Sequence, residues 1–149
     1  MWMLVRANAL GRDEPGPDGR RVLAACPDTA ERGDPWRWSV GLQDGPDGAV
    51  ATATTDETYV VHRDELFAGR HTGTVVRPAG DVLVVAVLRG EALVAVEDGP
   101  WERWVRPGDV FVLEGEDDEL LRISLAGGDS AATVFVLSPT TPRALRWVP

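Results

Sequence analysis

The chain has 149 residues, 44% of them hydrophobic and 26% charged, which predicts one globular domain over residues 1–149 and excludes a disordered chain. The net charge of −9 argues against a nucleic-acid partner, and because all fifteen basic residues are arginines, lysine-dependent chemistry such as Schiff-base catalysis is excluded. A single cysteine, Cys26, excludes an internal disulfide. The chain shows no signal peptide, and its longest apolar run is Val82–Leu88, so we expect a soluble, cytoplasmic protein without a membrane partner.

Short runs rich in Val, Leu, Trp and Thr, punctuated by Gly and Pro, predict twelve β-strands. In chain order they are Trp2–Arg6, Arg21–Ala25, Trp36–Leu42, Val50–Thr54, Thr58–His62, Thr72–Arg77, Val82–Leu88, Ala92–Glu97, Trp101–Val105, Val110–Leu113, Glu119–Leu125 and Thr133–Leu137. Two helical candidates, Asp28–Arg32 and Asp64–Gly69, are too short for more than a turn or two. Short strands at this spacing are typical of an antiparallel sandwich or barrel, so we expect an all-β fold.

The run Val82–Leu88 is apolar at every position, which indicates a strand covered on both faces. In Glu119–Leu125, by contrast, apolar Leu121 and Ile123 alternate with Leu120, Arg122 and Ser124, so one face of that strand is expected to meet water. A barrel whose outer face is covered by extra N-terminal strands would bury Val82–Leu88 on both sides. We therefore expect the first fifty residues to supply that cover.

Two turn motifs frame the apolar strands that follow Val82. Leu88-Arg89-Gly90-Glu91 follows one apolar strand, and Arg106-Pro107-Gly108-Asp109 precedes another. The two glycines stand where tight turns need a positive φ, and Pro107 favours the corner. The pattern resembles the centre of a cupin barrel, with its LxGE and xPGD turns. The resemblance implies a cupin-like, antiparallel jelly-roll β-barrel in which the Leu88–Gly90 and Pro107–Asp109 turns close consecutive strands.

A second resemblance extends over most of the chain through short motifs. Leu4–Ala7, Asp34–Ser39, Pro78–Asp81 and Leu88–Gly90 occur in the order found in the HutD/Ves family of small, cupin-like proteins. The PWKNGGG signature of that family is replaced here by Asp13–Pro17. The resemblance implies a protein that binds a small molecule without a metal and has a sensor or accessory role.

The resemblance to cupins also indicates where metal-binding members carry their ligands. In this chain those positions fall at or near Val76, Pro78, Leu83 and Asp118, a set without an imidazole. Because a transition metal needs converging imidazole and carboxylate ligands, we expect neither a metal nor another cofactor. Asp118 is the one carboxylate that the resemblance directs inward.

The two histidines, His62 and His71, flank Arg63–Arg70 between two expected strands, so a hairpin would make them cross-strand neighbours. Histidine suits proton transfer because its unperturbed pKa is about 6.5. Both histidines are therefore candidate catalytic residues, together with Tyr59 and Asp118. The alternatives are that the histidines are exposed loop residues or belong to an unusual metal site.

Trp36 and Trp38 are two residues apart on one expected strand and therefore share a face. If they face the interior, they form an aromatic wall for a ligand; if they face outward, they serve the core or a dimer surface. Arg77 is a third candidate ligand-binding residue, because an inward guanidinium would pair with a carboxylate.

Three functions remain open at this point. The first is binding of a small, largely apolar molecule, expected to be neutral or weakly basic because the chain is acidic. The second is a metal-independent enzyme, such as a cyclase or isomerase, that acts on an apolar molecule inside the barrel. The third is a structural module that forms a homodimer. A titratable group inside an enclosed apolar pocket would favour the enzyme.

Overall fold

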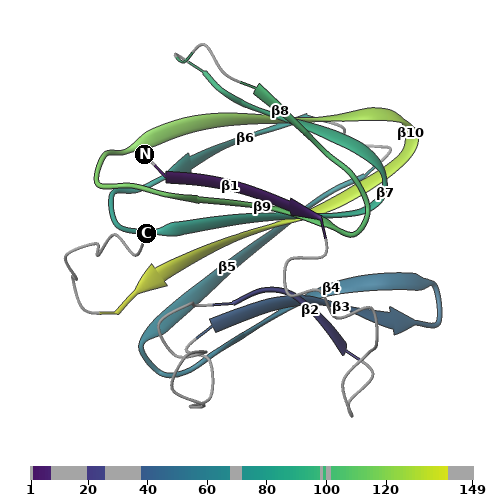
Figure 1. Cartoon of the computed structure of the whole chain (residues 1–149), viewed down its shortest axis with the longest axis horizontal. Helices are drawn as coiled ribbons and strands as arrows, with labels where there is room; N and C mark the ends of the chain where they lie inside the picture. Colours follow the sequence, from purple (N-terminus) through teal and green to yellow (C-terminus); the bar gives the residue numbers. More distant parts are fainter. Residues whose placement is uncertain are drawn as a thin grey trace.

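Ten strands in two antiparallel sheets make up the part of the chain that the computed structural model describes, namely residues 2–7, 20–25, 38–67, 72–97, 99 and 102–140 (Figure 1). The strands are β1 (Trp2–Ala7), β2 (Arg20–Ala25), β3 (Trp38–Gly45), β4 (Gly48–Thr55), β5 (Tyr59–Leu66), β6 (Thr72–Arg77), β7 (Val82–Val96), β8 (Glu102–Val105), β9 (Asp109–Glu114) and β10 (Glu119–Pro139). Within these ranges no helix is long and apolar enough to cross a membrane. The prediction of an all-β, antiparallel fold is confirmed.

The seven-stranded sheet is built around two long strands, β7 and β10, which pair from Leu121 opposite Val96 to Leu137 opposite Val82. Beyond β7 lie β9 and then β1 along its first half, and β8 along its second half. Beyond β10 lie β6 along its first half and β5 along its second half. Both long strands curve midway, so this one sheet forms two layers, with β6 and β8 in one and β1, β5 and β9 in the other (Figure 1).

The three-stranded sheet, of order β2-β3-β4, lies against the outer face of the layer that contains β9 (Figure 1). We call it the cover sheet. Its buried side chains, among them Trp38, Val40 and Ala51, form one apolar cluster with Val84 of β7 and Val112 of β9. We call this cluster the cover core. A second cluster, the interior core, lies between the two layers of the large sheet.

Consecutive residues of β7 belong alternately to these two cores. Val82, Val84 and Ala86 belong to the cover core, whereas Leu83, Val85 and Val87 belong to the interior core. All six side chains are buried, because successive side chains of a strand point to opposite faces and both faces are covered. The prediction that N-terminal strands cover Val82–Leu88 is therefore confirmed for β2, β3 and β4.

The expected barrel differs from the structure in its closure and in one of its turns. Neither sheet closes on itself within the described ranges. The Leu88–Gly90 turn does not separate two strands either, because β7 runs without interruption from Val82 to Val96. Gly90, at a φ of 69°, instead lies at the bend, opposite an irregularity of β10 between Ala126 and Ala131. A positive-φ glycine and a bulge let two paired strands bend together and keep their ladder on either side.

The Pro107–Asp109 turn joins β8 to β9 as predicted. The amide of Asp109 donates to the carbonyl oxygen of Arg106 at 2.9 Å, and Gly108 has a φ of 89°. A positive φ at the third position of a turn is the type II geometry, with proline before it.

One helical expectation is wrong. Asp64 and Leu66 belong to β5, where Leu66 lies opposite Ala132 of β10. A helix of one or two turns is marginal, whereas pairing with β10 supplies a ladder partner for each of these residues. The other helical candidate, Asp28–Arg32, lies outside the described residues.

Substitution of two glycines tests the bend of β7. A Cβ at Gly90 would clash with Oγ of Ser130 and lie 2.7 Å from its Cβ, whereas a Cβ at Gly108 has no heavy atom within 4 Å. Gly108→Ala is expected to cost about 1–2 kcal/mol of unfolding free energy, from backbone strain alone. Gly90→Ala adds a steric clash and is expected to cost about 2–5 kcal/mol. Urea denaturation measures both; equal losses would contradict the close approach of Gly90 and Ser130.

Candidate functional site

One edge of the large sheet places polar side chains on the interior face. β5 and β6 both border β10 on the side away from β7. His62 and Asp64 point to the same face as Leu66, a member of the interior core, because alternate residues of a strand share a face. Val75 of β6 and Val136 of β10 pack against that core and remain partly exposed. We call His62, Asp64, Val75 and Val136 the edge site.

The centre of the interior is filled by apolar side chains. Leu83, Val85, Phe111 and Leu113 are all fully buried in the interior core. Small barrels are commonly filled in this way by their own side chains. The interior face reaches solvent at the edge site, where Val75 and Val136 are partly exposed.

The structure describes one member of the expected cross-strand pair of histidines. His62 is exposed and lies opposite Val136 of β10, and His71 lies outside the described residues. The two strands that flank the histidines pair with different halves of β10 and not with each other, so the described residues form no hairpin there. No group of three His, Cys, Asp or Glu side chains in the described ranges has the arrangement needed to hold a metal ion.

Tyr59 of β5 and Trp38 of β3 face the cover core, on the side of the β5 layer away from the edge site. Tyr59 packs, partly buried, against the cover core, and Trp38 lies within that core with 2% of its surface exposed. Trp36 lies outside the described residues. Of the two alternatives predicted for Trp38, a ligand wall or a place in the core, the structure shows the core. It does not bring Trp38 or Tyr59 together with His62.

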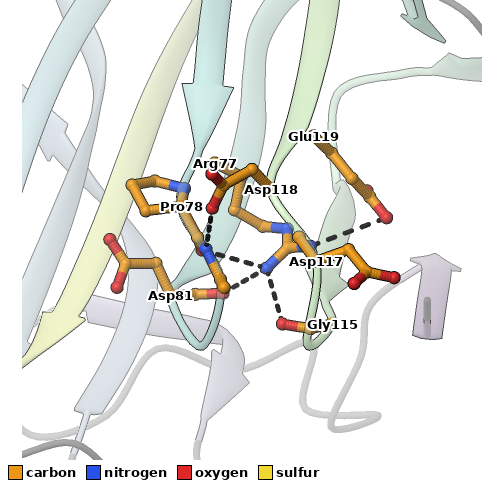
Figure 2. Close-up of polar contacts among 8 residues, drawn as sticks. Arg77, Pro78, Asp81, Gly115, Asp117, Asp118 and Glu119 are labelled. Carbon is orange, nitrogen blue, oxygen red and sulfur yellow. Dashed lines mark hydrogen bonds and ion pairs between the residues drawn. The ribbon is translucent and has the colours of Figure 1, made fainter.

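Arg77 is fully buried at one end of the two layers, between the β6–β7 turn and the β9–β10 loop (Figure 2). Its two terminal nitrogens donate to four main-chain carbonyl groups, those of Pro78 (3.2 Å), Asp81 (3.1 Å), Gly115 (3.0 Å) and Asp117 (2.8 Å). One of these nitrogens, Nη2, also lies 3.6 Å from Oε1 of Glu119, whose side chain is 10% exposed. The guanidinium therefore ties together the two connections that pass between the layers.

Asp118 joins the same two connections from outside. Its exposed carboxylate accepts a hydrogen bond from the amide of Ala79 through Oδ1 at 2.7 Å. The amide of Gly80 donates to the carbonyl oxygen of Gly115 at 2.9 Å. The structure thus brings Asp118 close to Arg77 and places His62, Tyr59 and Trp38 elsewhere.

Three further polar side chains at this end, those of Glu119, Asp81 and Ser138, are absent from the sequence-based site. Glu119 lies directly opposite Arg77 in the β6–β10 register, and the hydroxyl of Ser138 donates to Oδ2 of buried Asp81 at 2.6 Å. The sequence indicates that Glu119 faces inward, because it is two residues from inward-facing Leu121 and alternate residues of a strand share a face. Asp81 stood out only as the last residue of the Pro78–Asp81 motif, and nothing in the sequence paired it with Ser138.

The comparisons with known proteins concern strand arrangement only. No family model and no curated protein matches the chain. Similar solved structures include a de novo designed double-stranded beta-helix, with 12% identity, a TM-score of 0.39, and coverage of 54% of this chain and 97% of that one. A chain from crystal structures of the DMSP lyases RdDddP and RnDddQII shows 16% identity, a TM-score of 0.41, and coverage of 70% and 48%. An ethanolamine utilization protein Q from Salmonella typhimurium LT2 shows 18% identity, a TM-score of 0.37, and coverage of 69% and 72%.

The chain spans about half the length of the lyase chain that it matches. At these identities and TM-scores the likeness bears on neither activity nor ligand. The resemblance to the HutD/Ves family stays a prediction.

Proposed function

We propose that the protein binds a small, largely apolar molecule at the edge site, in a sensor or accessory role. The observation that carries the proposal is the composition of this edge. Val75 and Val136 continue the interior core to the point where it meets solvent, and His62 and Asp64 lie on the same face. Ligand sites combine an apolar surface with a few polar groups that fix orientation.

The charges at the edge site favour a neutral or weakly basic ligand. Asp64 shares the interior face, whereas the guanidinium of Arg63 lies on the opposite face, 5.8 Å from the centroid of the Phe135 ring. That guanidinium is also paired with Glu65 at 2.6 Å. Together with the net charge of −9, this arrangement disfavours an anionic ligand.

A metal-independent isomerase or cyclase is the second candidate function. One observation favours it: His62 and Asp64 are two residues apart on one strand and share a face, so a general acid and a general base would meet the same ligand. His62→Gln separates the two functions. A binding protein would show no turnover before or after the change, whatever happens to its affinity, whereas an enzyme would lose turnover.

The binding proposal is tested by titrating the ¹⁵N-labelled protein with cyclohexylmethylamine, cyclohexanecarboxamide and cyclohexanecarboxylate. The amine and the amide are expected to shift the backbone amide signals of Val75, Val136 and His62, and the carboxylate to bind most weakly. Loss of one valine contact, worth about 1.5 kcal/mol, predicts that Val75→Gln weakens binding about tenfold.

The matched control is Val76→Gln. Val76 is the next residue of β6 and is 56% exposed on the other face. Its substitution is expected to leave affinity unchanged. Equal effects of the two variants, or no shift with any of the three compounds, would contradict binding at the edge site.

A further inference from the structure

The interior face of β6 continues from the edge site to a buried polar end. Arg77 is two residues beyond Val75 and shares its face, and Glu119 lies opposite Arg77 on β10. At a rise of about 3.3 Å per residue, the Cα atoms of Val75 and Arg77 are about 6.6 Å apart. A small molecule in contact with Val75 is therefore long enough to reach the Arg77 side chain.

Two atoms at this end are buried without a hydrogen-bond partner among the described residues, Nε of Arg77 and Oε2 of Glu119. The first is a donor and the second an acceptor. The two side chains do not satisfy each other, because their closest atoms, Nη2 and Oε1, are 3.6 Å apart, beyond hydrogen-bond distance (Figure 2). Buried polar groups in native proteins are almost always paired, so an unsatisfied donor on Arg77 and an unsatisfied acceptor on the facing Glu119 indicate a missing partner.

The surrounding charges restrict what that partner is. An anion would accept from Nε of Arg77 but would face the carboxylate of Glu119, and Asp81 is buried close by. A cation would donate to Glu119 but would face the guanidinium. Burial of an additional charge is also costly unless that charge is fully compensated. A neutral group that both accepts and donates satisfies both atoms and adds no charge.

We infer that the ligand carries a carboxamide at this end, an inference that rests on the proposed function. The amide oxygen accepts from Nε of Arg77, and the amide N–H donates to Oε2 of Glu119. The apolar part of the ligand lies against Val75 and Val136. Arg77 and Glu119 thereby set the polarity of the head group, and the edge site sets that of the body.

The test varies the compound and keeps the protein unchanged, because Arg77 also supports the fold. Cyclohexanecarboxamide is compared with its methyl ester analogue, methyl cyclohexanecarboxylate, which accepts but cannot donate, and with cyclohexanecarboxylate. The affinity and the Nε–Hε NMR signal of Arg77 are measured in each titration. The amide is expected to bind about tenfold more tightly than the other two compounds and alone to shift the Arg77 signal.

Each outcome separates this inference from the function on which it rests. If all three compounds shift the Val75 signal with equal affinity and the Arg77 signal does not move, binding at the edge site stands and the carboxamide inference fails. If Hε of Arg77 still shows cross-relaxation with water in the amide-bound protein, the partner of Nε is a water molecule. In that case too, binding at the edge site stands and the carboxamide inference fails. If no compound shifts any signal, both proposals fail.

Discussion

Arg77→Met is expected to lower the free energy of unfolding by about 3–5 kcal/mol, which is typical when one partner of a buried ion pair is removed. Methionine has nearly the length of arginine but no donor, so the carboxylate of Glu119 stays buried without a cation. The four carbonyl groups that accept from the guanidinium also lose that donor. Urea denaturation monitored by tryptophan fluorescence measures the loss.

The matched control for this variant is Arg122→Met. Arg122 makes an ion pair at 2.6 Å with Glu97, but its side chain is 54% exposed. An exposed pair contributes about 0–1 kcal/mol, so little stability is expected to be lost. Replacing Arg77 and Glu119 together should recover part of the loss, because no unpaired charge is then buried. Similar losses for Arg77→Met and Arg122→Met would show that burial of the guanidinium contributes nothing.

Trp38→Ala is expected to destabilise the protein by about 3–5 kcal/mol through the cavity that it leaves in the cover core. Trp104→Ala is the matched control: Trp104 is 50% exposed, so its loss is expected to change stability by no more than about 0.5 kcal/mol. Thermal and urea unfolding of both variants give the comparison.

The ligand titration provides a second measurement on Trp38→Ala. Trp38 lies on the opposite side of the layer from the edge site, so the fraction that stays folded should bind cyclohexanecarboxamide with unchanged affinity. If binding is lost while stability is preserved, Trp38 is part of a ligand wall and its assignment to the cover core is wrong.

The sequence predicts the strands of this fold well because the pattern of apolar residues in each strand follows from which of its own faces are buried. Val82–Leu88 is apolar throughout since it is buried on two faces, and that property is visible without knowledge of the neighbouring strands. The continuity of β7 was not visible in the same way. A glycine with positive φ serves equally in a turn that ends a strand and at a bend that does not. Gly90 lies at a bend and not at the end of a strand because β10 pairs with β7 on both sides of it. That segment of β10 lies more than thirty residues further along the chain.

The candidate site depended more heavily on such long-range pairing. The expected neighbours of His62 lay on the next strand along the chain, whereas β5 pairs with the end of β10. Asp118 was expected to point inward, but its carboxylate caps the backbone of the β6–β7 turn, and Glu119 is the residue that faces Arg77. One residue of register separates the two acidic side chains, and a run of acidic residues in a loop does not fix that register.

The cover sheet also has a consequence for how the protein opens. No backbone ladder joins it to the large sheet in the described part of the chain, so the two are held together there by the apolar side chains of the cover core. Detachment of β2, β3 and β4 would break none of the hydrogen bonds between β7 and its neighbours. We therefore expect amide protons of the cover sheet to exchange with solvent through a partial opening, at lower free energy than those of β7 and β10. That opened form would present Val84 and Val112 to water as part of a continuous apolar surface, so aggregation of this protein should begin from it before the molecule as a whole unfolds.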